Sequence, residues 1–175
     1  MSPRLEVDRP AAASDDDVLE PAGVSNWFPV LGLVFAVAGV GVSSYLTAAH
    51  YTTTSILACS GSGAINCAKV TTSSQSMLIG IPVAVLGLGW FLAMAVLNLP
   101  AAWRSGSAAA AVIRLVLAVG GMGFALYLIS AELLSIKAIC LWCTTAHVLT
   151  FGLFVLTLAG TSRLGLTVAP RGAVR

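Results

Sequence analysis

Four long stretches of this sequence carry almost no charge, and they constrain the fold more than any other feature. A helix needs about 20 apolar residues to cross a hydrocarbon layer of roughly 30 Å, because each residue adds about 1.5 Å. Of the 175 residues, 58% are hydrophobic and only 9% are charged. The sequence therefore predicts an all-α integral membrane protein, a bundle of four transmembrane helices at about 27–50, 77–99, 108–131 and 138–159.

The segments outside these helices are short. Residues 1–25 hold six of the seven acidic residues and no apolar core, so we expect a disordered cytoplasmic tail rather than a signal peptide. Residues 161–175 are expected to form a short basic cytoplasmic tail. Residues 26–160 then form one membrane domain, in which a large extracytoplasmic loop at 51–76 joins the first two helices. Loops of this length often carry functional residues.

The distribution of Lys and Arg predicts the orientation in the membrane. With a cytoplasmic N-terminus, seven of the nine basic residues lie inside and only Lys69 and Lys137 lie outside. We therefore expect a multi-pass protein of the cell (inner or plasma) membrane with both termini in the cytoplasm. Arg114, near the start of the third helix, is expected to snorkel to the interface rather than to be buried. The net charge of +2 is too small to indicate a nucleic-acid partner.

All four cysteines fall on the expected outer side, where disulfides persist. Cys59 and Cys67 lie in the large loop, separated by a glycine-rich segment that can fold back so that the sulfurs meet. Cys140 and Cys143 form a C-x-x-C pair at the N-terminal turn of the fourth helix, where free N–H groups favour the thiolate. Two dithiols on one face indicate a relay of thiol–disulfide exchange from loop to helix, with a lipid-soluble oxidant such as a quinone below it.

Other interpretations of the same residues have to be weighed. Inert buried cysteines explain any one of the four, but not a C-x-x-C that faces a second pair. A zinc site is disfavoured by the C-x7-C spacing and the oxidising side, so we expect no metal. His50 and His147 lie near the same face and could ligate a b-type haem, although a lone histidine is more often a packing residue. Trp142 is expected to be an interfacial anchor, and Thr71 to Ser74 are expected to cap the second helix.

Several motifs in this order resemble one known family. The C-x7-C pair is followed by the segments Cys67 to Ser73, Gly80 to Leu88 and Cys140 to Thr145. Together they resemble the vitamin K epoxide reductase family, specifically its bacterial homologues, over about 27–159. The resemblance implies a four-helix bundle around a pocket for a quinone of the menaquinone or ubiquinone type.

The resemblance also implies roles for the cysteines. Cys140 and Cys143 would be the active-site pair, with Cys143 engaging the quinone. Cys59 and Cys67 would receive electrons from a thioredoxin-like or DsbA-like extracytoplasmic protein, and Cys67 would bond transiently to Cys140. The implied function is a membrane thiol oxidoreductase that supports disulfide bond formation.

Two further positions follow from the same resemblance. Ser73, six residues after Cys67, would lie near the quinone and the reactive sulfur. His147 stands where animal members have a tyrosine, and its imidazole can still donate a hydrogen bond to a bound quinone. The asparagine that holds the quinone in animal members has no clear counterpart within 75–79.

The sequence leaves rival functions open. Many bacterial relatives carry a fused thioredoxin-like domain after a fifth helix, and this chain stops soon after the fourth, so we expect a separate partner protein. The animal activity, reduction of vitamin K quinone and epoxide, is one alternative. A DsbB-type oxidase is another, although such proteins place the C-x-x-C pair in the first outer loop. A bis-histidine haem carrier and a structural four-helix membrane protein with passive disulfides are the alternatives from other classes.

Overall fold

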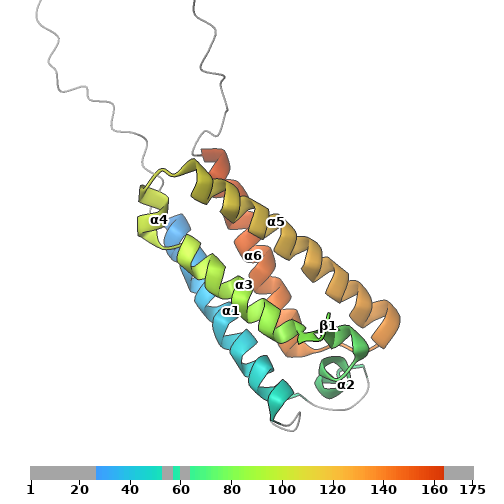
Figure 1. The fold of residues 1–175 in the computed structure, drawn as a ribbon. Coiled ribbons are helices and arrows are strands. Elements are labelled where there is room, and N and C mark those ends of the chain that lie inside the picture. Colours follow the sequence, from blue (N-terminus) through green and yellow to red (C-terminus); the bar gives the residue numbers. More distant parts are fainter. Residues whose placement is uncertain (1–26, 53–56, 60–63, 164–175) are drawn as a thin grey trace, which may run out of the picture.

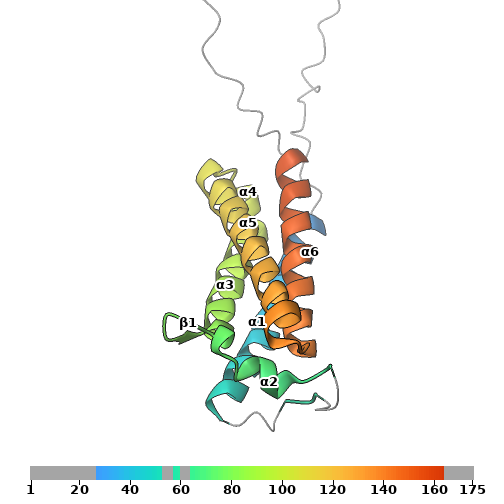
Figure 2. The same ribbon diagram turned by 90° about the vertical axis from the view of Figure 1, so that its right-hand side faces the viewer.

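A computed structural model of the chain describes residues 27–52, 57–59 and 64–163. Four helices lie along one another and form an elongated bundle (Figures 1 and 2). These are α1 (Trp27–Tyr51), α3 (Val83–Leu97), α5 (Ala108–Ser130) and α6 (Leu141–Arg163). The tail expected at 1–25 lies outside the described residues, as does 164–175, whereas 161–163 continue α6.

Short elements lie at the two ends of the bundle (Figure 1). One end holds α4 (Pro100–Arg104). The other end holds α2 (Cys67–Thr71), the 3-10 helix η2 (Ser74–Ser76), the π-helix η3 (Ala131–Ile136) and an antiparallel pair of two-residue strands, β1 (Met77–Leu78) and β2 (Ile81–Pro82).

Three helical segments of the described chain are long and apolar enough to cross a membrane: Trp27–Tyr51, Ala108–Ile136 and Leu141–Ser162. The prediction of a helical membrane protein is thereby confirmed. The first expected helix, at about 27–50, matches α1 within a residue. The third continues without a break through η3, which ends at Ile136 because Lys137 adopts a left-handed conformation. The fourth, expected from about 138, begins at Leu141.

The helix expected at 77–99 begins six residues late, because the chain first makes a hairpin. Ile79 and Gly80 at the turn have φ angles of 52° and 80°, which a right-handed helix does not allow. Pro82, which has no N–H to donate, precedes the first residue of α3. The helix that remains, Val83–Leu97, has 15 residues and is shorter than the other three.

Arg114 is buried, so the expectation that it snorkels to the interface is wrong. Its side chain is 1% exposed, and its Nε and Nη2 atoms donate to the carbonyl oxygen of Leu97 at 3.1 and 2.7 Å. The guanidinium also lies 3.8 Å from the centre of the Trp103 ring. The carbonyl at the end of α3 lacks a helical partner, and the ring face attracts a cation, so the two groups compensate the buried charge.

The buried apolar residues that the structure describes form two clusters. One lies in the middle of the bundle and comprises Ala36, Phe91, Met94, Ala118 and Leu153. The second lies at the end that holds α2 and includes two of the cysteines, Cys67 and Cys140. The short elements of that end therefore pack on the bundle, and the cysteines form part of its core.

The close approach of α1 and α3 gives a testable prediction. A Cβ added at Gly39 would overlap the ring of Phe91, whereas one added at Gly41 would meet nothing within 4 Å. We expect Gly39→Ala to lower the free energy of unfolding by about 1–3 kcal/mol, the usual range for overpacking. Gly41→Ala lacks this overlap and gains the helix propensity of alanine, so it should leave the free energy of unfolding unchanged or raise it by up to about 1 kcal/mol. Thermal unfolding of both variants in the same detergent measures the difference, and equal midpoints would contradict the packing.

Candidate functional site

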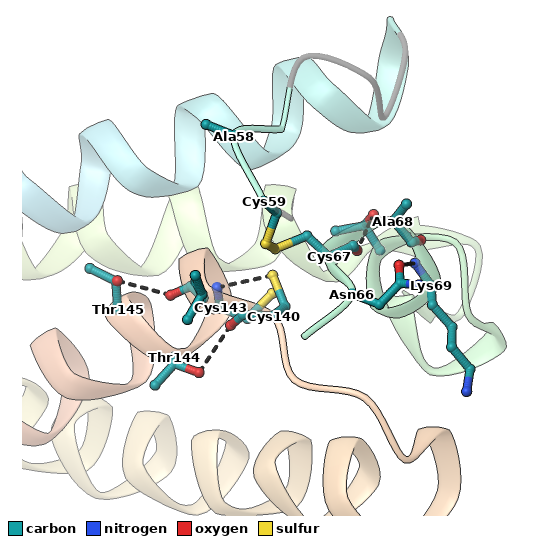
Figure 3. Close-up of a disulfide and its surroundings, with 12 residues drawn as sticks. Ala58, Cys59, Asn66, Cys67, Ala68, Lys69, Cys140, Cys143, Thr144 and Thr145 are labelled. Atoms are coloured by element: carbon teal, nitrogen blue, oxygen red, sulfur yellow. Dashed lines mark hydrogen bonds between the residues drawn. A yellow bond between two sulfur atoms is a disulfide. The ribbon is translucent and has the colours of Figure 1, made fainter. Parts of the chain in front are cut away.

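Cys59 and Cys67 form a disulfide in the loop between α1 and α3, with their Cα atoms 5.9 Å apart (Figure 3). Cys67 is buried at 1% exposure and is the first residue of α2, whereas Cys59 is half-buried. Asn66 caps α2, because its side-chain oxygen accepts a hydrogen bond from the backbone N–H of Lys69 at 2.9 Å. The prediction that the two loop sulfurs can meet is confirmed.

Backbone hydrogen bonds connect this loop to the C-x-x-C turn. The N–H of Asn66 donates to the carbonyl of Ile139 at 3.0 Å, and the N–H of Ile139 donates to the carbonyl of Ala64 at 2.8 Å. The segments form a short parallel bridge between Ile65 and Ile139. Since Asn66 precedes Cys67 and Ile139 precedes Cys140, the bridge places the disulfide beside the second cysteine pair.

Cys140 and Cys143 are both free thiols at the start of α6. Cys140 is fully buried, and the backbone N–H of Cys143 donates to its sulfur at 3.3 Å. The pKa of Cys140 lies below its usual range, chiefly because the Cys143 side chain also hydrogen-bonds to its sulfur; burial and the charge of Glu132 act in the opposite direction. Cys140 is thus the cysteine whose thiolate the turn stabilises.

Aromatic side chains complete the packing around the four cysteines. Trp142, between the two cysteines of the C-x-x-C pair, packs against Tyr45 of α1 with ring centroids 4.7 Å apart. The Tyr45 hydroxyl accepts a hydrogen bond from the N–H of Ala58, next to Cys59, at 3.1 Å. Cys59, Cys143 and both rings all pack against the cluster that contains Cys67 and Cys140. Trp142 therefore connects the C-x-x-C turn to the loop, a role that the sequence did not indicate.

A cavity of about 360 Å³ lies next to this cluster, inside the bundle. Its wall is mostly apolar, with side chains from α1, α3, α5 and α6, and it includes the three residues expected near a quinone: Cys143, Ser73 and His147. Ligand pockets of this volume, apolar with a few polar groups, suit a ring with polar oxygens. The residues present therefore fit a quinone.

The Ser73 hydroxyl does not donate its hydrogen bond to a sulfur. It donates to the carbonyl of Val70 at 2.7 Å, at the end of α2, and the Ser73 carbonyl in turn accepts from Ser76. A hydroxyl has one proton to donate, so Ser73 would have to rotate before it could stabilise a Cys143 thiolate or a quinone oxygen.

His50 and His147 line the same cavity. Among the described residues no three His, Cys, Asp or Glu side chains gather in a way that could hold a metal ion. Two of the four thiolates that a zinc site would use are joined in the loop disulfide.

Glu132 is the site residue that the sequence analysis missed. It lies in η3, is 6% exposed, and its Oε2 atom accepts a hydrogen bond from the N–H of Cys140 at 3.5 Å. It also lines the cavity. One feature of the sequence could have identified it. Glu132 is the only acidic residue outside the first 20 positions, and it follows a long apolar helix.

Comparison with known proteins gives one family. The profile described as the vitamin K epoxide reductase family matches residues 30–158, which include all four cysteines and nearly all of the described helices. Among curated proteins, none matches the chain significantly.

The hydrogen bonding at the C-x-x-C turn predicts how the Cys140 thiol titrates. Replacing Cys143 by Ala removes the main group that lowers the pKa of Cys140, so the pH midpoint of Cys140 alkylation should rise. Cys143→Ser keeps a donor and should keep a lower midpoint than Cys143→Ala. The midpoint of each variant is measured from the mass shift on alkylation at a series of pH values. Both variants also carry Cys59→Ser and Cys67→Ser, so that Cys140 is the one remaining thiol. Identical midpoints would contradict the arrangement.

Proposed function

The chain belongs to the vitamin K epoxide reductase family, whose members are membrane thiol–disulfide oxidoreductases, and on this premise we propose that it oxidises an extracytoplasmic dithiol protein and reduces a membrane quinone. The dithiol protein is a separate thioredoxin-like or DsbA-like partner, and the result is disulfide bond formation in that partner. The observation that carries the proposal is a loop disulfide packed against a free C-x-x-C pair beside an apolar cavity.

Electrons enter at the loop. A thiolate of the partner attacks the Cys59 sulfur and displaces Cys67, and the partner's second thiol then releases Cys59, so that the partner is oxidised and the loop pair is reduced. This direction agrees with burial, since Cys59 is half-buried whereas Cys67 is 1% exposed and lies beside Cys140.

The reduced loop pair then reduces the C-x-x-C pair in its oxidised form. The Cys67 thiolate attacks the Cys140 sulfur and displaces Cys143, after which Cys59 attacks Cys67, restores the loop disulfide and releases Cys140. Cys140 is the natural leaving group of this second step, because the N–H of Cys143 and the turn around it stabilise its thiolate.

The quinone, of the menaquinone or ubiquinone type, accepts two electrons and two protons when bound in the cavity. Cys143 reaches that cavity from the start of α6, His147 lies one turn further along the helix, and Ser73 faces them from the loop. The apolar side chains around them exclude water and leave an environment that an isoprenoid quinone can enter from lipid.

We place the bundle across the cell membrane as four spans. The 15 residues of α3 extend about 22 Å, so the second span as we place it also includes the hairpin residues before this helix. The helices α2 and α4 lie at opposite ends of the bundle (Figure 1). Lys69 belongs to α2, at the end that holds the cysteines, and Lys137 ends η3 close to Cys140, whereas Arg104 belongs to α4. The excess of basic residues puts the α4 end and both termini in the cytoplasm, and the cysteines outside.

Loss of Cys143 tests the function. With a reduced thioredoxin-like dithiol and a short-chain quinone as substrates, Cys143→Ala should abolish quinone-dependent turnover, because no second thiol remains to complete the disulfide. Thr145→Ala, an exposed change two residues away, should retain it. Undiminished turnover by the Cys143→Ala variant would refute the assignment.

The route between the pairs is tested by trapping. A variant with Cys59→Ser and Cys143→Ala leaves Cys67 and Cys140, which should accumulate as a disulfide after mild oxidation. The matched variant with Cys67→Ser and Cys143→Ala leaves Cys59 and Cys140 and should form less of it. Peptide mass mapping under non-reducing conditions measures both yields, and a higher yield for Cys59 would reverse the proposed order.

A further inference from the structure

Glu132 is the only acidic residue among those the structure describes, and it lies at the reaction end of the bundle. Its side chain is 6% exposed, and its carboxylate accepts one hydrogen bond, from the N–H of Cys140. It lines the 360 Å³ cavity together with Cys143 and His147. A second cavity of about 380 Å³, between α5 and α6, is lined by Glu132 and His147 as well. Glu132 thus stands in the wall between two cavities.

Among the described residues, this carboxylate has one hydrogen-bond donor and no partner cation. The basic side chains nearest in sequence and on α2, Lys137 and Lys69, are both exposed, and no described residue forms an ion pair with Glu132. Burial without a partner cation costs free energy, which a residue kept only for structure would avoid by being apolar or neutral. The remaining titratable groups that face the same cavity are His147, His50 and Cys143, with Cys140 beside it.

The proposed reaction needs a group that can hold a proton at this place. Oxidation of the Cys140/Cys143 dithiol breaks two S–H bonds and releases two protons, and reduction of a quinone takes up two. The Cys140 sulfur is fully buried, so bulk water has no direct access to it. A thiolate beside a charged carboxylate would also place two negative charges together in an apolar site, and moving one proton from sulfur to carboxylate keeps the buried charge constant.

Resting on the function proposed above, we propose that Glu132 is the proton carrier of this site, which takes protons from the cysteine sulfurs and passes them to the bound quinone. Each passage starts with the carboxylate, forms the neutral acid as an S–H bond breaks, and ends with the carboxylate again as an O–H bond forms. Two passages accompany the formation of one Cys140–Cys143 disulfide and one quinol, so atoms and electrons balance.

Glu132→Gln tests the carrier, because glutamine keeps the shape and an oxygen that can accept the Cys140 N–H but cannot carry a proton at neutral pH. With dithiothreitol and a short-chain naphthoquinone, we expect its kcat to fall by at least about 100-fold, the lower range for loss of a general acid–base group, with little change in KM. Glu132→Asp should recover part of the rate, and Ser135→Ala, an exposed change in the same segment, should keep all of it. Wild-type turnover by Glu132→Gln, or equal rates for the Gln and Asp variants, would overturn the proposal.

A second readout needs no quinone. In the native site, the hydrogen bonds from Cys143 lower the pKa of Cys140, and the charge of Glu132 raises it by a smaller amount. The effect of that charge is measured in the background Cys59→Ser, Cys67→Ser and Cys143→Ser, in which Cys140 is the one remaining thiol. Glu132→Gln should therefore shift the midpoint of Cys140 alkylation to lower pH, and Ser135→Ala should not. An unchanged midpoint would show that Glu132 holds no charge beside the dithiol and would overturn the proposal.

The two proposals fail in different ways. If the wild-type protein reduces no quinone, the function proposed above is wrong. If the wild-type protein reduces quinone and Glu132→Gln does so equally well, the function stands and only the role of Glu132 is wrong. Reduction of the loop disulfide by dithiothreitol should be the same in both proteins, because that step precedes the proton transfer.

Discussion

Two backbone hydrogen bonds, between Ile139 and the loop residues Ala64 and Asn66, hold the loop disulfide next to the C-x-x-C pair. They join segments more than seventy positions apart in the sequence. Ile139 directly precedes Cys140, and Asn66 directly precedes Cys67. Asn66 contributes twice, since its side chain also caps α2 and so fixes the direction in which Cys67 enters the core. Disulfide exchange needs sulfurs in line and in contact, and here the backbone bridge, together with the Asn66 cap, brings the two pairs together.

The bundle supplies what the loop cannot, a mostly apolar cavity next to the cysteines. Where α1 and α3 approach closely, the ring of Phe91 occupies the room left by Gly39, and the middle of the bundle is filled. Toward the cysteine end the hairpin before α3 diverts the chain, and the cavity opens between the helices. The same feature that shortens α3 therefore lies next to the space in which a quinone fits.

Hydropathy predicted the helices well because apolar length is a local property of the sequence, and α1 matches its expected range within a residue. It did not predict the hairpin, since Ile79 is as apolar as its neighbours and only its backbone angle ends the pattern. Nor did it predict the burial of Arg114, which depends on Trp103 of a different helix. At the site, the family resemblance grouped Cys143, Ser73 and His147 near a quinone, and the structure places all three in the wall of one cavity. The direction of the Ser73 hydroxyl and the place of Glu132 depend on tertiary contacts that no spacing encodes.

Among the described residues, the buried charged side chains are Arg114 and Glu132, and they differ in how their charge can be neutralised. Arg114 cannot lose its proton in a protein, so its charge is permanent and must be compensated by fixed groups, the Leu97 carbonyl and the Trp103 ring. Glu132 has one fixed partner, the N–H of Cys140, and no cation beside it among the described residues, but a carboxylate can be neutralised by a proton. In an apolar interior, electrons that moved without protons would leave a new buried charge at every step. A redox site in this bundle therefore needs titratable groups beside its sulfurs, and the end that contains the cysteines is the end where the structure places them.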